Sequence, residues 1–94
     1  MEIMDLKHPF YGYAMTEDGV IYLSVIEVAE EERRKGHFRQ FIDDTKKAYH
    51  TIKVPQPSPF LEALLTRYDF VKSQEFFESA GQMITVMVWR SRAR

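Results

Sequence analysis

The chain has 94 residues, enough for one domain, and its 45% hydrophobic and 29% charged residues are typical of a folded globule. Its formal net charge of -1 gives no overall attraction to nucleic acid or to an anionic membrane, and we expect neither as a partner. It has no cysteine, which excludes a disulfide framework, a thiol nucleophile and a thiolate zinc site. We therefore expect a single domain over residues 1–94.

The N-terminus and the histidines narrow the class of protein further. No apolar run approaches the ~20 residues that a membrane-spanning helix needs. Residues Met1–Asp5 carry acids where a secretory signal needs basic residues, which predicts a cytoplasmic protein. His8, His37 and His50 are scattered along the chain, so we expect no metal site.

The first third of the chain has the composition of a β-hairpin. Residues Phe10–Met15 are rich in aromatic side chains, and Val20–Val28 is mostly β-branched and aliphatic. Asp18-Gly19 between them is a strong signal for a tight hairpin turn. Because both faces of Val20–Val28 are largely apolar, the pattern predicts a central strand covered on both sides.

The hydrophobic period then changes from that of a strand to that of a helix. Helical spacing predicts an amphipathic helix over residues 37–49, with an apolar stripe of Phe38, Phe41, Ile42, Thr45 and Tyr49. Ile52–Val54 is a short strand candidate that ends at Pro55.

The second half begins with a helix start signal. Ser58 followed by Pro59 is typical of an N-cap with proline at the first helical position. A shorter helix follows, with an apolar stripe of Phe60, Leu61, Leu64, Leu65 and Tyr68. Strands are predicted from Phe70–Val71 and over Met83–Trp89. The predicted fold class is α/β with a mixed sheet, in the order β-β-α-β-α-β-β, with helices on both faces.

The segment between the central strand and the first long helix carries the candidate chemistry. The first amides of a helix lack partners within the helix, and the helix dipole places partial positive charge there. Gly36 leaves room for a ligand to approach the backbone, and Arg33, Arg34 and Lys35 add positive charge. Together these features predict a phosphate or pyrophosphate site. The pattern is neither a P-loop nor a Rossmann fingerprint, and the simpler interpretation is a solvated charge run in which Gly36 eases a turn.

The same segment resembles the central motif of the GCN5-related N-acetyltransferases. In that family a strand leads through [Gln/Arg]-x-x-Gly-x-[Gly/Ala] into a helix with paired aliphatics, and Arg33, Gly36 and Phe38 occupy those motif positions here. Leu61–Val71 is similar to the late helix of the family and to the Leu-Gly-Phe that ends it. The resemblance spans residues 10–90, and the chain length is similar to that of minimal members, including small phage-encoded acetyltransferases that modify a host protein.

The resemblance implies that acetyl-CoA is the co-substrate. Its pyrophosphate would lie on the backbone amides of residues 33–38, which are Arg33, Arg34, Lys35, Gly36, His37 and Phe38. Backbone groups near Ile26 and Val28 would hold pantetheine like an added strand, and the amide near Val28 would polarise the thioester carbonyl. In the family an amine attacks the thioester directly, so the absence of cysteine is no obstacle.

Direct attack requires a base, because an amine such as lysine is protonated at neutral pH. Glu27 is the best-placed carboxylate and would take the proton directly or through a water. The alternative is a charged residue on an uncovered part of the sheet. Tyr68 is the candidate proton donor to the departing thiolate, against the alternative of a core aromatic. His50 is a further candidate relay, against simple solvation at the end of a helix.

Two residues depart from the family pattern. Phe38 replaces a small residue, so its ring must turn into the core or crowd the cofactor. The late-helix tyrosine of the family would fall at Leu65, which cannot donate a proton. Both departures favour an alternative in which the fold is catalytically degenerate and acts as a protein-binding module. A third possibility is a small α/β interaction protein whose motif match is accidental.

The acceptor side is short by comparison with the family, because about nine residues replace its first strand and first two helices. A small acceptor would find few groups to orient it, and orientation supplies much of the rate in such reactions. We therefore favour a lysine or N-terminal amine on a protein as the acceptor. A homodimer could also close the site, so monomer and homodimer both stay open.

Overall fold

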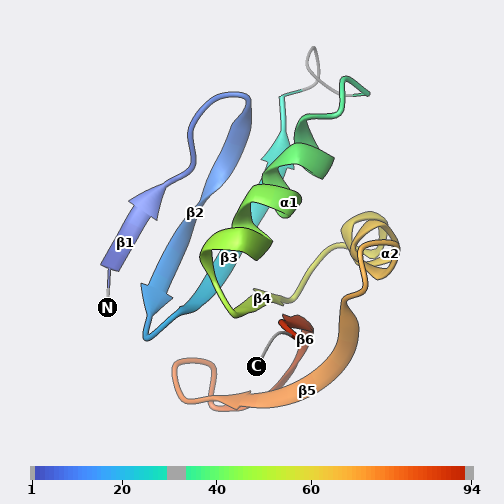
Figure 1. The fold of residues 1–94 in the computed structure, drawn as a ribbon. Helices are drawn as coiled ribbons and strands as arrows, with labels where there is room; N and C mark the ends of the chain where they lie inside the picture. The colour runs from blue at the N-terminus through green and yellow to red at the C-terminus, as the bar shows by residue number, and fades with distance from the viewer. Residues whose placement is uncertain (1, 30–33, 93–94) are drawn as a thin grey trace.

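The computed structural model describes residues 2–29 and 34–92, which form one mixed sheet and two helices (Figure 1). The sheet order is β1-β2-β3-β4-β6-β5. Only β3 and β4 pair in parallel, which makes the sheet mixed as predicted. The strands are β1 Glu2–Asp5, β2 Phe10–Glu17, β3 Val20–Val28, β4 Thr51–Pro55, β5 Val71–Phe77 and β6 Gln82–Arg90, and the helices are α1 His37–Ala48 and α2 Pro59–Thr66.

The predicted hairpin is confirmed as β2 and β3. The two strands pair antiparallel up to Glu17 and Val20, which leaves Asp18 and Gly19 as the connecting residues. Both have positive φ, at 51° and 80°, and Asp-Gly suits that backbone because glycine adopts positive φ without strain and aspartate tolerates it.

Strand β1 was not predicted. It pairs antiparallel with β2, and all four of its residues are exposed at the edge of the sheet. A four-residue segment with an acid at each end has no hydrophobic period, so only its pairing with β2 shows that it is a strand.

The two helices confirm the local signals. Helix α1 buries Ile42 and Thr45, and Phe38, Phe41 and Tyr49 pack around the same core, as the predicted stripe required. In α2 the Ser58 hydroxyl accepts a hydrogen bond from the Leu61 amide at 3.2 Å, with Pro59 at the first position of the helix. The N-cap prediction is therefore confirmed.

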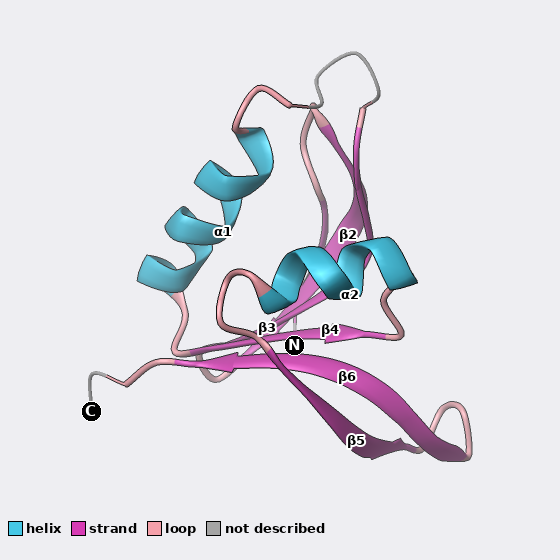
Figure 2. Ribbon diagram, turned by 90° about the vertical axis from the view of Figure 1, so that its right-hand side faces the viewer, coloured by secondary structure: helices cyan, strands magenta, loops and turns pink. Residues whose placement is uncertain are grey.

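The prediction that helices cover both faces of the sheet is wrong. One core cluster joins Ile42 of α1 and Leu65 of α2 to Leu23, Val54 and Met87 of the sheet, so both helices pack on the same face. Figure 2 shows both helices on the inner side of the twisted sheet. No helix of the described residues covers the other face, which we call the open face.

The open face is shielded over β6 by side chains of the sheet itself. Ile84, Val86 and Val88 form a second buried cluster there, with Phe77 packed against it. The ion pair between Lys53 of β4 and Glu75 of β5, with 3.0 Å between nitrogen and oxygen, spans β6 on this face.

Strands β3 and β4 separate soon after they pair. Their register covers only Val20–Tyr22 against Thr51–Lys53, and beyond Tyr22 the described part of β3 pairs with β2 alone. The register between β2 and β3 shifts at this point. Tyr11 pairs with Glu27 and Tyr13 pairs with Ser24, so an advance of two residues on β2 corresponds to three residues on β3. A β-bulge therefore lies in β3 between Ser24 and Glu27. The strand ends beside a gap in the sheet, and its backbone edge faces that gap.

Candidate functional site

A cleft of about 670 Å³ lies where β3 ends and the two helices begin. A volume of this size is within the usual range of small-molecule sites. The cleft is lined by residues of the end of β3, of the start of α1, and of α2 with the turn that follows it. These residues are Ile26, Glu27, Arg34, Gly36, His37, Phe38, Arg39, Ser58, Phe60, Leu61, Leu64 and Tyr68.

The N-terminus of α1 forms one wall of this cleft. Gly36 is the N-cap, with φ 82° and ψ 5°, and as a glycine it contributes no side-chain cap to the helix. The first turn of α1 contains no acidic residue. A Cβ at Gly36 would meet nothing within 4 Å, so the constraint at this position is its left-handed backbone. The dipole of α1 therefore places partial positive charge against the cleft with no carboxylate in that turn to offset it.

The structure brings most of the predicted site residues together. Ile26, Glu27, Arg34, Gly36, His37, Phe38 and Tyr68 all line the cleft. Val28 ends β3 opposite Phe10, and Lys35 is exposed in the loop beside the cleft. Arg33 lies outside the described residues.

Phe38 and Tyr68 meet across the cleft wall. Their ring centroids are 5.8 Å apart with the rings tilted by 55°, and both side chains are half-buried against the core. The Phe38 ring therefore packs against the core and forms part of the cleft wall. Leu65 is fully buried and does not line the cleft, whereas Tyr68, three residues further along the chain, does.

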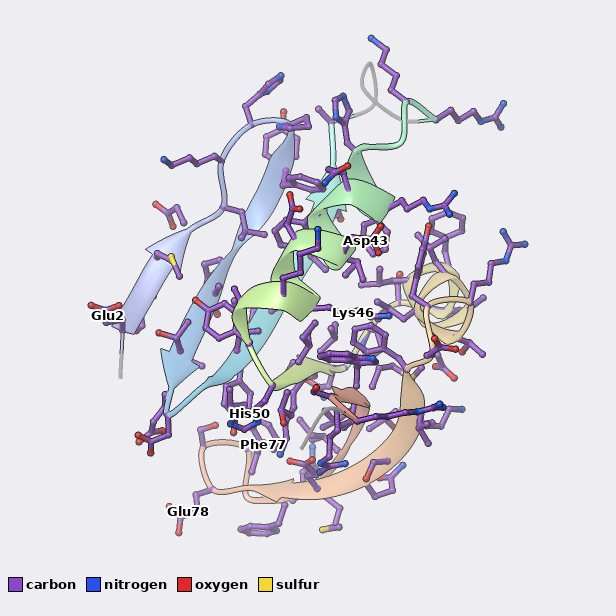
Figure 3. The ribbon with its side chains drawn as sticks, in the orientation of Figure 1. Glu2, Asp43, Lys46, His50, Phe77 and Glu78 are labelled. Carbon is purple, nitrogen blue, oxygen red and sulfur yellow. The ribbon has the colours of Figure 1, made fainter. Side chains whose placement is uncertain are left out.

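Lys46 of α1 contacts the chain at Tyr68, behind this part of the cleft wall. Its ammonium donates a hydrogen bond to the Tyr68 carbonyl at 2.7 Å and lies 5.1 Å from the centroid of the Trp89 ring. Figure 3 shows Lys46 reaching from α1 toward the α2 side of the molecule. The lysine thus fixes the turn after α2, which carries Tyr68, against α1, which carries Phe38.

Glu27 reaches its position because of the bulge in β3. Ile21 and Leu23 face the helices, so a regular strand would also turn residue 27 toward them. The extra residue puts Ile26 in the helix-side core and turns Glu27 to the same face as its partner Tyr11. Glu27 is exposed and also lines the cleft, so it lies at the point where the cleft meets the open face.

Several lining residues were not predicted as parts of a site. Arg39 lies in the first turn of α1, and Ser58, Phe60, Leu61 and Leu64 lie at the N-cap of α2 or within α2. Phe60 was placed in the apolar stripe of its helix, but its side chain is 78% exposed. The helical spacing indicates this exposure. Leu61 and Leu65 are four residues apart and so lie on the same side of the helix, and Phe60 is one residue outside that row.

His50 is not part of the cleft. Its ring nitrogens pair with the Thr51 hydroxyl at 2.9 Å and the Asp18 carbonyl at 3.1 Å, at the opposite end of α1. Among residues 2–29 and 34–92, no three histidine, aspartate or glutamate side chains gather as a metal site would require. Neither described helix is long and apolar enough to span a membrane.

Comparison with known proteins identifies the fold. No protein-family profile matches the chain, and no curated protein matches it. Among solved structures, it is similar to a protein from Agrobacterium tumefaciens assigned as an acetyltransferase, with a TM-score of 0.60 and 19% sequence identity. The similarity covers 95% of this chain and 73% of that one. The chain therefore has an acetyltransferase-like α/β fold, while its resemblance to small phage-encoded members stays a prediction.

Proposed function

We propose that the chain is an N-acetyltransferase that uses acetyl-CoA and transfers its acetyl group to an amine. The observation that carries the proposal is the cleft, which lies between the start of α1 and the edge of β3 at the point where β3 has separated from β4. Hydrogen-bond donors aimed at an anion and an unpaired strand edge, placed side by side, suit a ligand with a diphosphate and an extended amide-containing arm. The fold similarity supports the same class of reaction.

The diphosphate would lie at the start of α1. Arg34, Gly36, His37 and Phe38 line this end of the cleft, and Arg33 and Lys35 belong to the same loop in the sequence. The pantetheine arm would follow the edge of β3 near Ile26 and Val28, where β4 has already separated. The apolar side chains of Leu61 and Leu64 would cover the arm from α2.

The chemistry would occur where β3 ends. The amine nitrogen attacks the thioester carbonyl carbon, the carbon–sulfur bond breaks, and CoA leaves as the thiolate. Glu27 would accept the proton that the amine loses, directly or through a water, and Tyr68 would donate one to the thiolate. Both residues line the cleft, which supports these roles.

We further propose that the acceptor amine belongs to a protein. Among the described residues, no helix lies before the β2–β3 hairpin and none covers the open face. A macromolecular acceptor would supply the missing wall with its own surface.

Titration of acetyl-CoA by calorimetry, with Gly36→Glu as the variant, tests the proposal. The new carboxylate would lie against the diphosphate, so binding should be lost. Gly81→Glu is the matched control, because Gly81 also has positive φ, at 67°, and also has open space around its Cβ. If the two variants bind acetyl-CoA as the wild type does, the proposed cofactor site is wrong.

A catalytically degenerate binding module is the second candidate, and Leu65 favours it, because the usual position of the proton donor is a buried aliphatic. Incubation with acetyl-CoA and a cell lysate, followed by mass spectrometry for acetylated lysines and N-termini, separates the two. Binding of acetyl-CoA without acetyl transfer would support the binding module.

A further inference from the structure

Two tyrosines on the open face each lie directly across from a carboxylate. Tyr11 of β2 pairs with Glu27 of β3, and Tyr13 of β2 pairs with Asp5 of β1. Partners in an antiparallel pair point to the same side, with Cβ atoms about 5 Å apart. The side chains of Tyr11 and Tyr13 are 58% and 40% exposed, and both carboxylates are exposed. We call these four residues the tyrosine–carboxylate face.

The same combination of groups already holds an ammonium elsewhere on the open face. The Lys53 ammonium lies 5.8 Å from the centroid of the Tyr22 ring and 3.0 Å from a Glu75 carboxylate oxygen. A tyrosine ring and a carboxylate together therefore bind a lysine side chain within this sheet.

The tyrosine–carboxylate face has no such cation of its own in the sheet. The described positions of β1, β2 and β3 that point to the open face include Asp5, Glu17 and Glu27 and no lysine or arginine. Lys7 and His8 belong to the β1–β2 turn and line a separate cavity beside α1, and Asp5, at the edge of the sheet, borders that cavity as well. The charge of this face is thus complementary to a cationic partner and repels a polyanion.

We infer that the tyrosine–carboxylate face binds an extended peptide with lysine or arginine at alternate positions, and that this peptide is the acetyl acceptor. Tyr11 and Tyr13 are two residues apart on one strand, about 6.6 Å, which matches the spacing of alternate side chains in an extended peptide. Glu27 belongs to both this face and the cleft, so a lysine bound beside Tyr11 would have its amine next to the proposed base. The inference rests on the proposed function and names its substrate class.

The experiment measures binding of a fluorescent, N-terminally acetylated peptide with the sequence Lys-Ser-Lys at its centre, by fluorescence anisotropy without acetyl-CoA. A peptide of the same composition with adjacent lysines is the first control, because its two side chains point to opposite sides when extended. Tyr13→Leu and Asp5→Asn should each weaken binding about threefold to tenfold. Tyr13→Phe should bind almost as the wild type does, because it keeps the ring face that attracts a cation.

Asp43→Asn is the matched control for Asp5→Asn, since it removes an exposed carboxylate from α1, on the other side of the sheet (Figure 3). Equal weakening by the two variants would overturn the inference, and so would equal affinity for both peptides. Competition by spermidine at the concentration of the peptide would identify a small cation as the ligand instead. Sedimentation showing a dimer that Tyr13→Leu dissociates would identify a second copy instead.

The two proposals fail separately. Peptide binding is measured without acetyl-CoA, and the acetyl-CoA titration is made without peptide. Normal acetyl-CoA binding with no peptide binding would overturn only the inference about this face. Peptide binding that follows the expected pattern, with no acetyl-CoA binding, would overturn the proposed enzyme and with it the role of the peptide as acceptor.

Discussion

The His50 ring lies directly against Gly19, in the turn of the β2–β3 hairpin. A Cβ on Gly19 would be 2.6 Å from His50 Cδ2 and 2.7 Å from Nε2. The His50 amide also donates to the Gly19 carbonyl at 3.1 Å. These contacts join the hairpin turn to the start of β4, at the end of the sheet where β3 and β4 still pair; Figure 3 marks His50 there.

Gly19→Ala should therefore destabilise the protein by about 2 kcal/mol or more. The positive φ at Gly19 costs an alanine about 1 kcal/mol, and the clash with the His50 ring adds to it. Urea denaturation measures the loss. Gly81→Ala, with φ 67° and open space, should cost only the backbone strain, and equal losses in the two variants would show that the His50 contact contributes nothing.

Lys46→Met should destabilise the protein by about 1–2 kcal/mol. The substitution leaves the Tyr68 carbonyl without its donor and removes the cation from the Trp89 ring. Lys47→Met is the control, because Lys47 lies in the same last turn of α1 and has the same interaction with the helix dipole. Comparing the unfolding temperatures of the two variants isolates the contribution of the contacts that only Lys46 makes. A similar decrease in unfolding temperature for both variants would show that these contacts do not stabilise the protein.

Tyr68→Phe should lower the rate of acetyl transfer about tenfold to a hundredfold while leaving stability and acetyl-CoA affinity near those of the wild type. The ring that packs against Phe38 is retained, and only the hydroxyl is removed. Steady-state kinetics and calorimetry on the same preparation provide the two readouts. An unchanged kcat would mean that Tyr68 is a wall of the cleft and donates no proton.

Glu27→Gln should lower kcat about a hundredfold and leave acetyl-CoA affinity unchanged, because the amide keeps the shape of the side chain but accepts no proton. Glu17→Gln is the control, since Glu17 is another exposed carboxylate of the same hairpin and lies at its far end. A Glu27→Gln variant with wild-type turnover would remove this residue from the mechanism.

Local signals predicted much of the fold, because they involve neighbours in the chain. Asp18-Gly19 suits the positive φ of a tight turn, and Ser58-Pro59 caps a helix with its own side chain, whatever lies elsewhere in the molecule. The stripe of α1 depends only on helical period. Each of these elements lies where the pattern indicated.

The sequence predicted the part of the cleft that one continuous segment forms, and it did not predict the parts that depend on contacts between distant segments. The loop at Gly36 is visible in the sequence because its glycine and basic residues are consecutive. The bulge that turns Glu27 away from the helices arises from the register between two strands, and no single segment encodes it. Phe60 and Arg39 both line the cleft because α1 and α2 lie on the same face of the sheet.

The amino-acid sequence alone determined the hairpin, the two helices with the N-cap of the second, and the loop that begins α1, because backbone preference and hydrophobic period act over a few residues. Tertiary structure alone decided that both helices share one face, that β3 leaves β4 beside the cleft, and that Tyr11 and Tyr13 face carboxylates across the sheet. Those relationships join residues that are distant in the chain, and strand register, which depends on the whole sheet, sets them.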